Sequence, residues 1–438
     1  ALGLGSPNFR LARDFSFFTS ERGLEVVGLD RGDLEKSMPV ATLPMKGARA
    51  VALSEDAVDA HARLAIVARE GGVAVVDVRS PAFPKEVGSV KVEDPCDLDV
   101  RGTKAYVAAG RDGLVVVDFE KPDRPRVIGK TGRGDARRLA LAGFYAYVVD
   151  AAGVSHRVES GPGAPEKESL DSALEVVDVA DPAAPKVAAV ANLDDDGRDA
   201  SAEEPGAIVT WWQWSRPDPK ANRGKGGRTA ARRLAAVATT RGVLHLVDLT
   251  EPARPVVFPR GPASRGRLAK VSVRALAYGR QYDLGSEGGA TPSVERDYVY
   301  IGGEEERGMK DRSYLFGLDV TTPEKPQPRG RSRAPADLRE LRLVHVYNPP
   351  NVQSFLFAAG RQGTTAVDVS RSDQFMPVAR LGGDGFRGTG SIAVEEMAFD
   401  RLFDWDGRLE KDISHPNARY FNRAEALRIL RAPLGGPP

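Results

Sequence analysis

The chain of 438 residues is poor in the residue types from which many common sites and anchors are built. It has one cysteine, Cys96, so it forms no internal disulfide and carries no C-x-x-C-H haem attachment. No apolar run approaches the roughly 20 residues of a membrane span. The 62 basic and 61 acidic residues leave a net charge of +1. That charge argues against a nucleic-acid binder, which is normally clearly basic.

Local catalytic motifs are also absent. The sequence has no G-x-S-x-G elbow, no H-E-x-x-H pair and no glycine-rich phosphate loop. The histidines share no motif, and two of them lie within strand patterns, where a hydrogen-bonded structural histidine is the ordinary interpretation. They are His61, His156, His245, His345 and His415.

What the chain does contain is a repeat. Residues 113–129 read GLVVVDFEKPDRPRVIG, an apolar run that ends in an aspartate, with proline four and seven residues later. Two further units, around Asp30 and Asp368, keep the aspartate but lose both prolines. Five units keep the full pattern, with Asp77, Asp118, Asp178, Asp248 and Asp319. Asp77 and Asp118 lie 41 residues apart, which is close to a minimal propeller blade.

Each unit has room for four short strands. In the unit of Asp118, an alternating stretch at 97–102 and an apolar stretch at 104–110 precede the repeat motif, and a short strand follows it. This organisation predicts an all-β fold, a seven-bladed β-propeller of four-stranded antiparallel blades. We expect the strand at 391–399 to pair beside residues 14–19 and close the ring. The predicted domains are a propeller over 1–400 and a C-terminal extension over 401–438, with a short helix packed on the propeller.

The repeated aspartate and prolines have a structural interpretation. The aspartate stands where the third strand leaves the sheet, so its carboxylate can accept N–H groups of the following turn. The first proline sets φ in that turn. The second begins the outermost strand, an edge where a missing N–H does little harm. The repeat is therefore informative about the fold and silent about chemistry.

These units resemble LVIVD repeats, which build β-propellers in bacterial and archaeal surface and secreted proteins. The resemblance rests on the apolar run before aspartate and the P-x-x-P after it, and it covers roughly residues 15–400. It implies export and a binding or scaffolding role, and it supplies no catalytic residues. The chain begins Ala1-Leu2-Gly3 without methionine, which predicts that a leader or a longer upstream portion has been removed.

Insertions interrupt the repeats, and they are where propellers acquire function. Residues 154–172, 303–313 and 191–206 fall at connections that share one face of a propeller. Residues 215–233 and 279–296 fall on the other face. The 191–206 segment is strongly acidic and the 215–233 segment strongly basic, so opposite faces should carry opposite local charge. Two solvated loops are the alternative interpretation.

One stretch has the spacing of calcium ligands. Asn192, Asp194, Asp196 and Glu203 occupy positions 1, 3, 5 and 12 of a loop with glycine at position 6. Alternate residues of a tight turn can direct their oxygens inward, where calcium prefers oxygen ligands. Asparagine at position 1 and the lack of a flanking helix depart from the pattern, and an acidic surface loop is the alternative.

The tryptophans Trp211, Trp212 and Trp214 form a cluster in the segment IVTWWQW. They could stack on a sugar or an aromatic ligand. Tryptophan on an inner strand more often fills the wedge between two blades, and packing is the interpretation that we favour.

The sequence thus favours a non-catalytic interaction or scaffold module of an exported or cell-surface protein. We expect a protein partner to bind through the insertions in 154–233, and calcium is the one cofactor that a motif suggests. The first alternative is a haem-free accessory subunit or domain of an exported electron-transfer assembly with multihaem cytochromes. The second is an enzyme whose site is assembled from separate blades across the central funnel, which would leave no local motif.

Overall fold

A computed structural model defines the fold. It describes residues 13–30, 36–55, 62–132, 134–157, 168–193, 205–214, 231–239, 243–258, 271–283, 294–305, 313–334, 338–348, 351–360, 363–371, 374–381 and 391–394.

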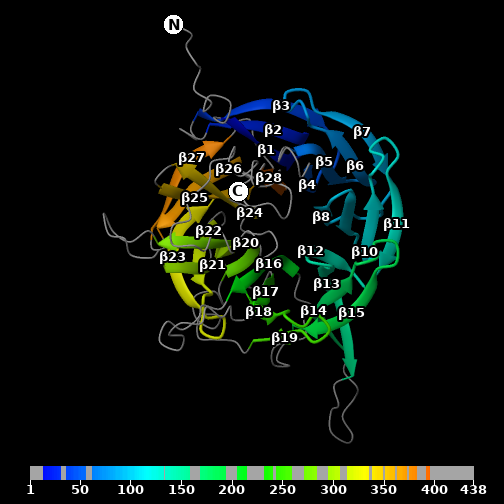
Figure 1. Ribbon diagram of the computed structural model, residues 1–438, viewed down its shortest axis with the longest axis vertical. Helices are drawn as coiled ribbons and strands as arrows, with labels where there is room; N and C mark the ends of the chain where they lie inside the picture. The colour runs from blue at the N-terminus through cyan, green and yellow to red at the C-terminus, as the bar shows by residue number, and fades with distance from the viewer. Residues whose placement is uncertain are drawn as a thin grey trace, which may run out of the picture.

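The described residues form seven four-stranded sheets arranged as a ring (Figure 1). In every sheet all neighbouring strands are antiparallel, so the predicted seven-bladed β-propeller is confirmed. The described part of the chain contains no α-helix, and none of its segments is a helix long and apolar enough to cross a membrane. The helix expected within 401–438 lies outside the described residues.

The blades follow one another in chain order. Blade 1 contains β1 (Arg13–Ser20), β2 (Gly23–Asp30), β3 (Met38–Pro44) and β28 (Ser391–Val394). Blade 2 contains β4 (Ala50–Glu55), β5 (Ala62–Arg69), β6 (Gly72–Asp77) and β7 (Lys85–Val90), and blade 3 contains β8 (Asp97–Arg101), β9 (Lys104–Ala108), β10 (Leu114–Asp118) and β11 (Arg126–Thr131). Blade 4 contains β12 (Ala136–Ala142), β13 (Tyr145–Arg157), β14 (Glu168–Asp178) and β15 (Lys186–Asn192), and blade 5 contains β16 (Pro205–Trp214), β17 (Ala231–Thr239), β18 (Leu244–Asp248) and β19 (Val256–Val257). Blade 6 contains β20 (Val271–Asp283), β21 (Val294–Glu305), β22 (Ser313–Asp319) and β23 (Gln327–Ala334), and blade 7 contains β24 (Leu338–Asn348), β25 (Asn351–Gly360), β26 (Gly363–Arg371) and β27 (Gln374–Leu381).

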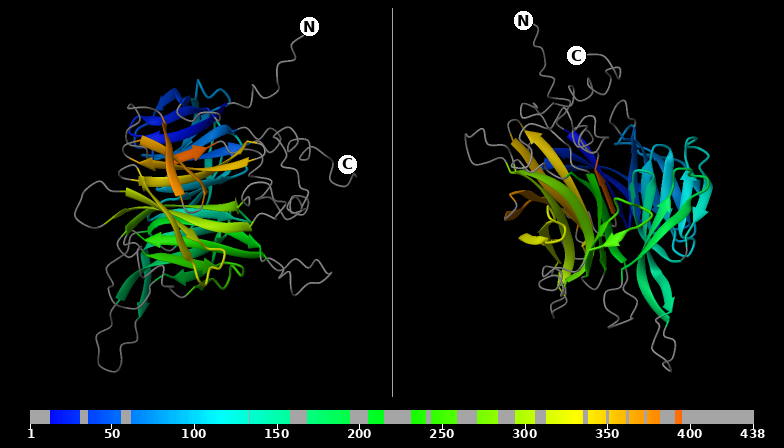
Figure 2. Two further views of the ribbon diagram at one scale, coloured as in Figure 1. Left: turned by 90° about the vertical axis from the view of Figure 1, so that its left-hand side faces the viewer. Right: turned by 60° about the horizontal axis from the view of Figure 1, so that its bottom comes forward.

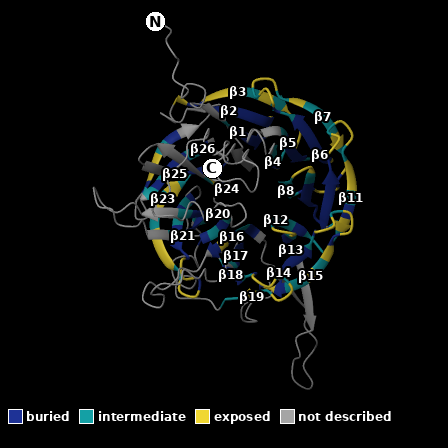
Figure 3. Ribbon diagram, in the orientation of Figure 1, coloured by how far each residue is buried: buried dark blue, intermediate teal, exposed yellow. Residues whose placement is uncertain are grey.

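The hydrophobic core lies between the blades. Seven buried clusters occur, one at each interface between neighbouring blades. Along β10, Val115 and Val117 pack toward blade 2, whereas Leu114 and Val116 pack toward blade 4. Both faces of the middle strands are therefore buried (Figure 3). This explains why the third strands of blades 2 and 3 are continuous apolar runs without polar alternation.

The ring is closed by a strand from the far end of the described chain. β28 pairs with β1 from Thr19↔Ser391 to Ser16↔Val394, which is where the sequence places it. Residues 395–399 of the predicted strand lie outside the described residues. Blade 1 is therefore built from both ends of the repeat region, and no inner sheet position is left open.

The repeat aspartates bind the turn that follows, as predicted. In each of the five full units a carboxylate oxygen accepts the backbone N–H two residues later, at 2.9–3.0 Å. Asp368 of the seventh unit makes the same bond to Ser370 at 2.8 Å. The aspartate thus satisfies a backbone donor that would otherwise lose its partner where the strand ends.

The P-x-x-P segment joins one blade to the previous one. Its first proline lies inside a β-turn, as in the bond from the N–H of Arg124 to the carbonyl of Lys121 at 2.9 Å. The turn of blade 4 rests on Gly129 of blade 3, where a Cβ would be 2.3 Å from the oxygen of Pro182 and 2.8 Å from Cδ of Pro185. Gly88 of blade 2 meets the turn of blade 3 in the same way. These prolines are therefore interface residues as well as turn formers.

The seventh unit replaces this contact with an aromatic ring. Phe375 stands seven residues after Asp368, at the position of the second proline, and it is buried. Its ring lies against Gly330 of blade 6, where a Cβ would be 2.5 Å from Cε1, and 5.8 Å from the ring of Tyr300. The loss of both prolines therefore does not remove the contact between blades.

The two faces of the disc carry different connections (Figure 2). The innermost strands of blades 2 to 7 all begin on the same face of the disc, which we call the first face. The first face also carries the turns between the second and third strands of these blades. The opposite, second face carries the turns between first and second strands and those between third and fourth strands. The insertions at 154–172, 191–206 and 303–313 thus occur at connections of the first face.

Replacing Gly129 by alanine tests the contact between blades. Because the added methyl group would overlap the turn of blade 4, we expect Gly129→Ala to lower the free energy of unfolding by about 1–3 kcal/mol. Lys130→Ala, an exposed position on the same strand, should change it by less than about 1 kcal/mol. Urea unfolding measures both, and equal stabilities of the two variants would show that the turn does not press on Gly129.

The capping role of Asp118 makes a second prediction. Its side chain is 8% exposed and accepts bonds from Lys104 at 2.9 Å and from the N–H of Glu120 at 3.0 Å. Asp118→Ala should therefore cost about 1–3 kcal/mol in the free energy of unfolding at neutral pH.

The pH dependence of that cost follows from the pKa of Asp118. Burial alone would raise this pKa, but the hydrogen bonds from Lys104, the Glu120 N–H and Arg126 outweigh it and lower the pKa. A carboxyl with a lowered folded-state pKa stabilises the fold above its unfolded value, about 3.9, and this contribution disappears as the pH falls through the folded value. The stability difference between the wild type and Asp118→Asn should therefore narrow below about pH 4. A difference in the free energy of unfolding that stays constant down to pH 2 would contradict this prediction.

Candidate functional site

The candidate site is the central cavity of the ring. Its volume is about 1100 Å³, and its wall is formed mainly by the innermost strands β4, β8, β12, β16, β20 and β24. Six arginines line it, namely Arg49, Arg137, Arg138, Arg274, Arg339 and Arg342. Five carboxylates line it as well, namely Asp97, Asp99, Asp135, Glu304 and Glu340. The cavity is therefore highly charged with both signs present.

Two of the carboxylates connect neighbouring blades. Asp97 and Asp99 are two residues apart on β8, so both side chains lie on the same side of the strand. Asp97 accepts the backbone N–H of Leu139 and Asp99 that of Leu141, both at 3.1 Å on β12 of blade 4. Each also accepts the N–H of the residue after it, at 2.8–2.9 Å. These bonds satisfy inner-edge donors of β12, which has no further strand on that side.

Asp99 has an unusual proton affinity. Its carboxyl keeps a part of its surface open to the cavity but lies deep within the ring, and this loss of hydration raises its pKa. The bonded N–H of Val100 and the positive charge of Arg342 in blade 7 act in the opposite direction. A carboxyl of raised pKa in a cavity is a common feature of functional sites, although networks that only support structure produce it too.

An ion-pair cluster lies at the first-face mouth of the cavity. Asp94 adopts a left-handed conformation, φ 40°, and accepts bonds from Arg49 at 2.7 Å and Arg137 at 3.2 Å. The bond from Arg49 is the largest contribution that lowers the pKa of Asp94. Arg137 also donates to Asp135 at 2.5 Å and to the sulfur of Cys96 at 3.4 Å. Burial nevertheless raises the pKa of the Cys96 thiol, so it is not an activated nucleophile.

Two arginines of the wall differ from the others. Arg138 donates to the backbone carbonyl of Gly206 at 3.0 Å, and Arg339 is exposed toward the cavity. Neither has a carboxylate partner in the described part of the chain. Because guanidinium groups bind carboxylates and phosphates well, the cavity is chemically suited to a polar ligand with an anionic group. The described residues contain no group of His, Cys, Asp and Glu that could hold a metal ion.

The tryptophans separate into different roles. Trp211 is buried and stacks on Tyr278 of blade 6 with 5.1 Å between ring centroids, as a wedge between blades. Trp212 is 43% exposed, and the guanidinium of Arg233 lies 4.0 Å from its ring centroid. The side chain of Trp214 lies outside the described residues. Packing is therefore the role of Trp211, whereas Trp212 keeps a free surface.

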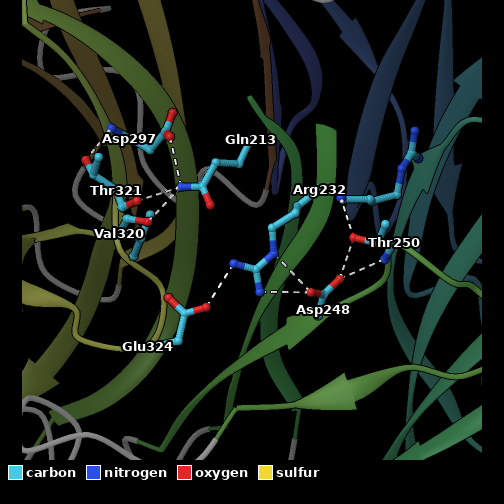
Figure 4. A network of polar contacts seen from close by, with 9 residues as sticks. Gln213, Arg232, Asp248, Thr250, Asp297, Val320, Thr321 and Glu324 are labelled. Atoms are coloured by element: carbon cyan, nitrogen blue, oxygen red, sulfur yellow. Dashed lines mark hydrogen bonds and ion pairs between the residues drawn. The ribbon is translucent and has the colours of Figure 1, made fainter. Parts of the chain in front are cut away.

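A polar network ties blades 5 and 6 together near the second face (Figure 4). The amide of Gln213 donates to Asp297, Val320 and Thr321, each at 3.1 Å. Arg232 donates to the repeat aspartate Asp248 at 2.9 Å and to Glu324 of the next blade at 2.8 Å. Arg232 thus connects the repeat aspartate of blade 5 to the P-x-x-P turn of blade 6, in which Glu324 lies.

The sequence did not identify the charged residues of the cavity. The stretches that we expected to be innermost strands contain Asp97, Asp99 and Arg138. The alternation of polar and apolar residues in these stretches was the available signal for side chains that face the cavity. That six such strands face one cavity depends on ring closure. Of the expected calcium ligands, Asn192 lies at the exposed end of β15, whereas Asp194, Asp196 and Glu203 lie outside the described residues. The buried His245 lies on β18.

The fold and its repeats place the protein in a defined class, that of seven-bladed β-propellers with short repeats. The family model of the LVIVD repeat matches residues 63–92, 94–130 and 133–154. These stretches cover β5 to β7 of blade 2, nearly all of blade 3 and the beginning of blade 4, so the chain carries LVIVD repeats. No curated protein matches the sequence at a significant level.

Solved structures of similar shape share little sequence with this chain. A hypothetical selenium-binding protein from Sulfolobus tokodaii is 10% identical, with a TM-score of 0.47, over 87% of this chain and 93% of its own. Apo AztD from Citrobacter koseri is 12% identical, with a TM-score of 0.43, over 87% of this chain and 98% of its own. Neither likeness extends to a ligand or an activity of this protein.

The calcium motif predicts a stabilising metal. If Asn192, Asp194, Asp196 and Glu203 bind Ca²⁺, millimolar calcium should raise the melting temperature, because a ligand that binds only the native state stabilises it. The double variant Asp194→Asn, Asp196→Asn should abolish the increase, and magnesium at equal ionic strength is the control for charge screening. A melting temperature that is indifferent to calcium would identify an acidic surface loop.

Proposed function

We propose that this propeller is a non-catalytic interaction module of an exported or cell-surface protein, and that it binds a protein partner through insertions in residues 154–233. The LVIVD repeats support the class, and the asymmetry of the insertions supports the location. Blades 2 and 3 are close to minimal, whereas blades 4 and 5 carry three long insertions between residues 154 and 230. A ring of similar blades offers no specificity by itself, so recognition is expected where the blades differ.

The observation that carries the proposal is a β-ribbon on blade 4. β13 and β14 continue past their sheet and pair from Val154↔Asp171 to Arg157↔Glu168. The neighbouring strands end earlier. The pairing of β12 with β13 stops at Asp150, and the pairing of β15 with β14 stops at Ala173. In the described part of the chain the ribbon is thus two strands wide, with backbone groups on both edges, and it projects from the ring (Figures 1 and 2).

Such a ribbon is suited to bind a polypeptide. Two-stranded hairpins are marginally stable alone, and an unpaired edge can accept another strand through backbone hydrogen bonds. The sequence adds charge of opposite sign at connections of blades 4 and 5 that fall on opposite faces of the ring. Residues 191–206 contain six acidic residues against one basic, and residues 215–233 contain seven basic against one acidic. These charges would steer a partner toward blades 4 and 5.

An enzyme or ligand-binding site in the central cavity is a second candidate function. The observation that favours it is Asp99, a carboxyl of raised pKa in a cavity of about 1100 Å³ that faces the positive charge of Arg342. Asp99 also accepts the backbone N–H groups of Val100 and of Leu141 in the neighbouring blade, which is a structural role, and we therefore rank this function second. Turnover that survives in Asp99→Asn would remove the argument.

Grafting a minimal turn tests the interaction proposal. In blade 3 the short turn Ala109–Gly113 connects β9 to β10, and the last residue pair before this turn is Ala108↔Leu114. The equivalent pair of β13 and β14 in blade 4 is Val149↔Leu174. Replacing residues 150–173 by Ala-Gly-Arg-Asp-Gly should remove the ribbon and leave the blade intact. We expect an unchanged seven-bladed fold by circular dichroism and at least a tenfold loss of affinity for the partner that co-purifies with the native protein.

The matched control is the same turn grafted into blade 6. The equivalent pair there is Gly302↔Leu315, so the turn replaces residues 303–314, and partner binding should be retained. Equal binding by both variants would contradict the ribbon as the contact. The proposed export is tested separately, by protease accessibility of the protein on intact native cells, and protection of the chain would rule out a cell-surface location.

A further inference from the structure

A buried arginine lies on the second face, between blades 4 and 5. Arg233 of β17 is only 6% exposed, and its guanidinium stacks on Trp212 with 4.0 Å to the ring centroid. It also packs on the backbone of the turn between β12 and β13. Gly143 of that turn has φ +57°, and a Cβ there would be 3.3 Å from Nη2 of Arg233. The side chain is therefore enclosed by two blades.

The guanidinium has no carboxylate partner in the described part of the chain. Nη1 is buried without a hydrogen bond, and so is the hydroxyl of Tyr147. The hydroxyl lies close enough to Arg233 to raise the pKa of the guanidinium, but the geometry falls short of a well-formed hydrogen bond. The adjacent Arg232 shows the contrast, because it binds both Asp248 and Glu324. Arg233 thus differs from its neighbour in being a buried guanidinium that no described carboxylate pairs.

A second cation increases the deficit of negative charge. Arg101, at the end of β8 in blade 3, is close enough that its charge disfavours the protonated form of Arg233. Burial, the larger cause, lowers the pKa of Arg233 in the same direction. A buried charge without a partner destabilises the fold, and a like charge nearby adds to the destabilisation. A bound anion would remove both penalties.

We propose that Arg233, with Arg101 and the hydroxyl of Tyr147, forms a binding site for an oxyanion, a carboxylate or a phosphate group. The planar guanidinium matches the two oxygens of either group. The buried guanidinium lies next to exposed surface, because Trp212 is 43% exposed and Phe144, directly after Gly143, is 69% exposed. Arginine and tryptophan together are the residue types that dominate protein binding sites.

This site is independent of the proposed partner contact on the β13–β14 ribbon. The ribbon belongs to the first face and the Arg233 site to the second, so either can fail without the other. The oxyanion could belong to a free small molecule or to an acidic polypeptide. Inorganic phosphate and poly-L-glutamate are the probes for these two sources.

The experiment is thermal unfolding of the full chain at constant ionic strength, with and without each probe. We expect at least one probe to raise the melting temperature of the wild type by at least about 2 °C at saturation. Arg233→Met should abolish this increase and, without probe, be as stable as the wild type or more so, because it removes an unpaired buried charge. Arg101→Gln should weaken the binding of that probe at least about tenfold, the loss of one charge-assisted bond.

Arg232→Met is the matched control. It should lower the melting temperature, because it leaves Asp248 and Glu324 without their cation, but it should keep the increase caused by the probe. A response to phosphate assigns the site to free oxyanions, and a response to poly-L-glutamate alone assigns it to acidic polypeptides. The proposal is overturned if the wild type responds to neither probe, or if Arg233→Met keeps the response.

Discussion

The structure depends on apolar contact between blades, because no blade can bury its own surface. The middle strands place alternate side chains on two opposite faces, and each face is covered only by a neighbouring blade. A four-stranded sheet with both faces apolar would be unstable alone, so stability is a property of the ring. This is why the ring has to close, and β28 achieves closure by completing blade 1 beside β1.

Polar contacts then set the spacing that the apolar contacts stabilise. At the rim, the repeat aspartate holds the turn, and the P-x-x-P segment rests on a glycine of the previous blade, as at Gly129. At the centre, Asp97 and Asp99 bind backbone donors of the next innermost strand. Blades 3 and 4 are thus connected at their outer and inner edges, with an apolar cluster between. The degenerate seventh unit keeps the outer contact through Phe375.

Sites for function arise where this regular pattern is broken. The central cavity collects charged side chains because the innermost strands of blades 2 to 7 face it. The β13–β14 ribbon exists because two strands outgrow their neighbours. Among the described residues Arg233 is buried without a carboxylate, whereas Arg232 beside it is paired with Asp248 and Glu324. In each case a local departure from the repeat leaves backbone or charge unsatisfied, and a binding partner could satisfy it.

The sequence by itself determined the seven repeats, the four strands of each blade, the all-β class and the aspartate-bonded turns. These features depend on spacing within about 40 residues, where periodicity and turn chemistry act. Tertiary structure alone decided which side chains meet. Asp99 and Arg342 share a cavity although 243 positions separate them, and Arg233 of blade 5 packs against Gly143 of blade 4. Such contacts follow from ring closure and from the rotation between blades, and neither leaves a local pattern in the chain.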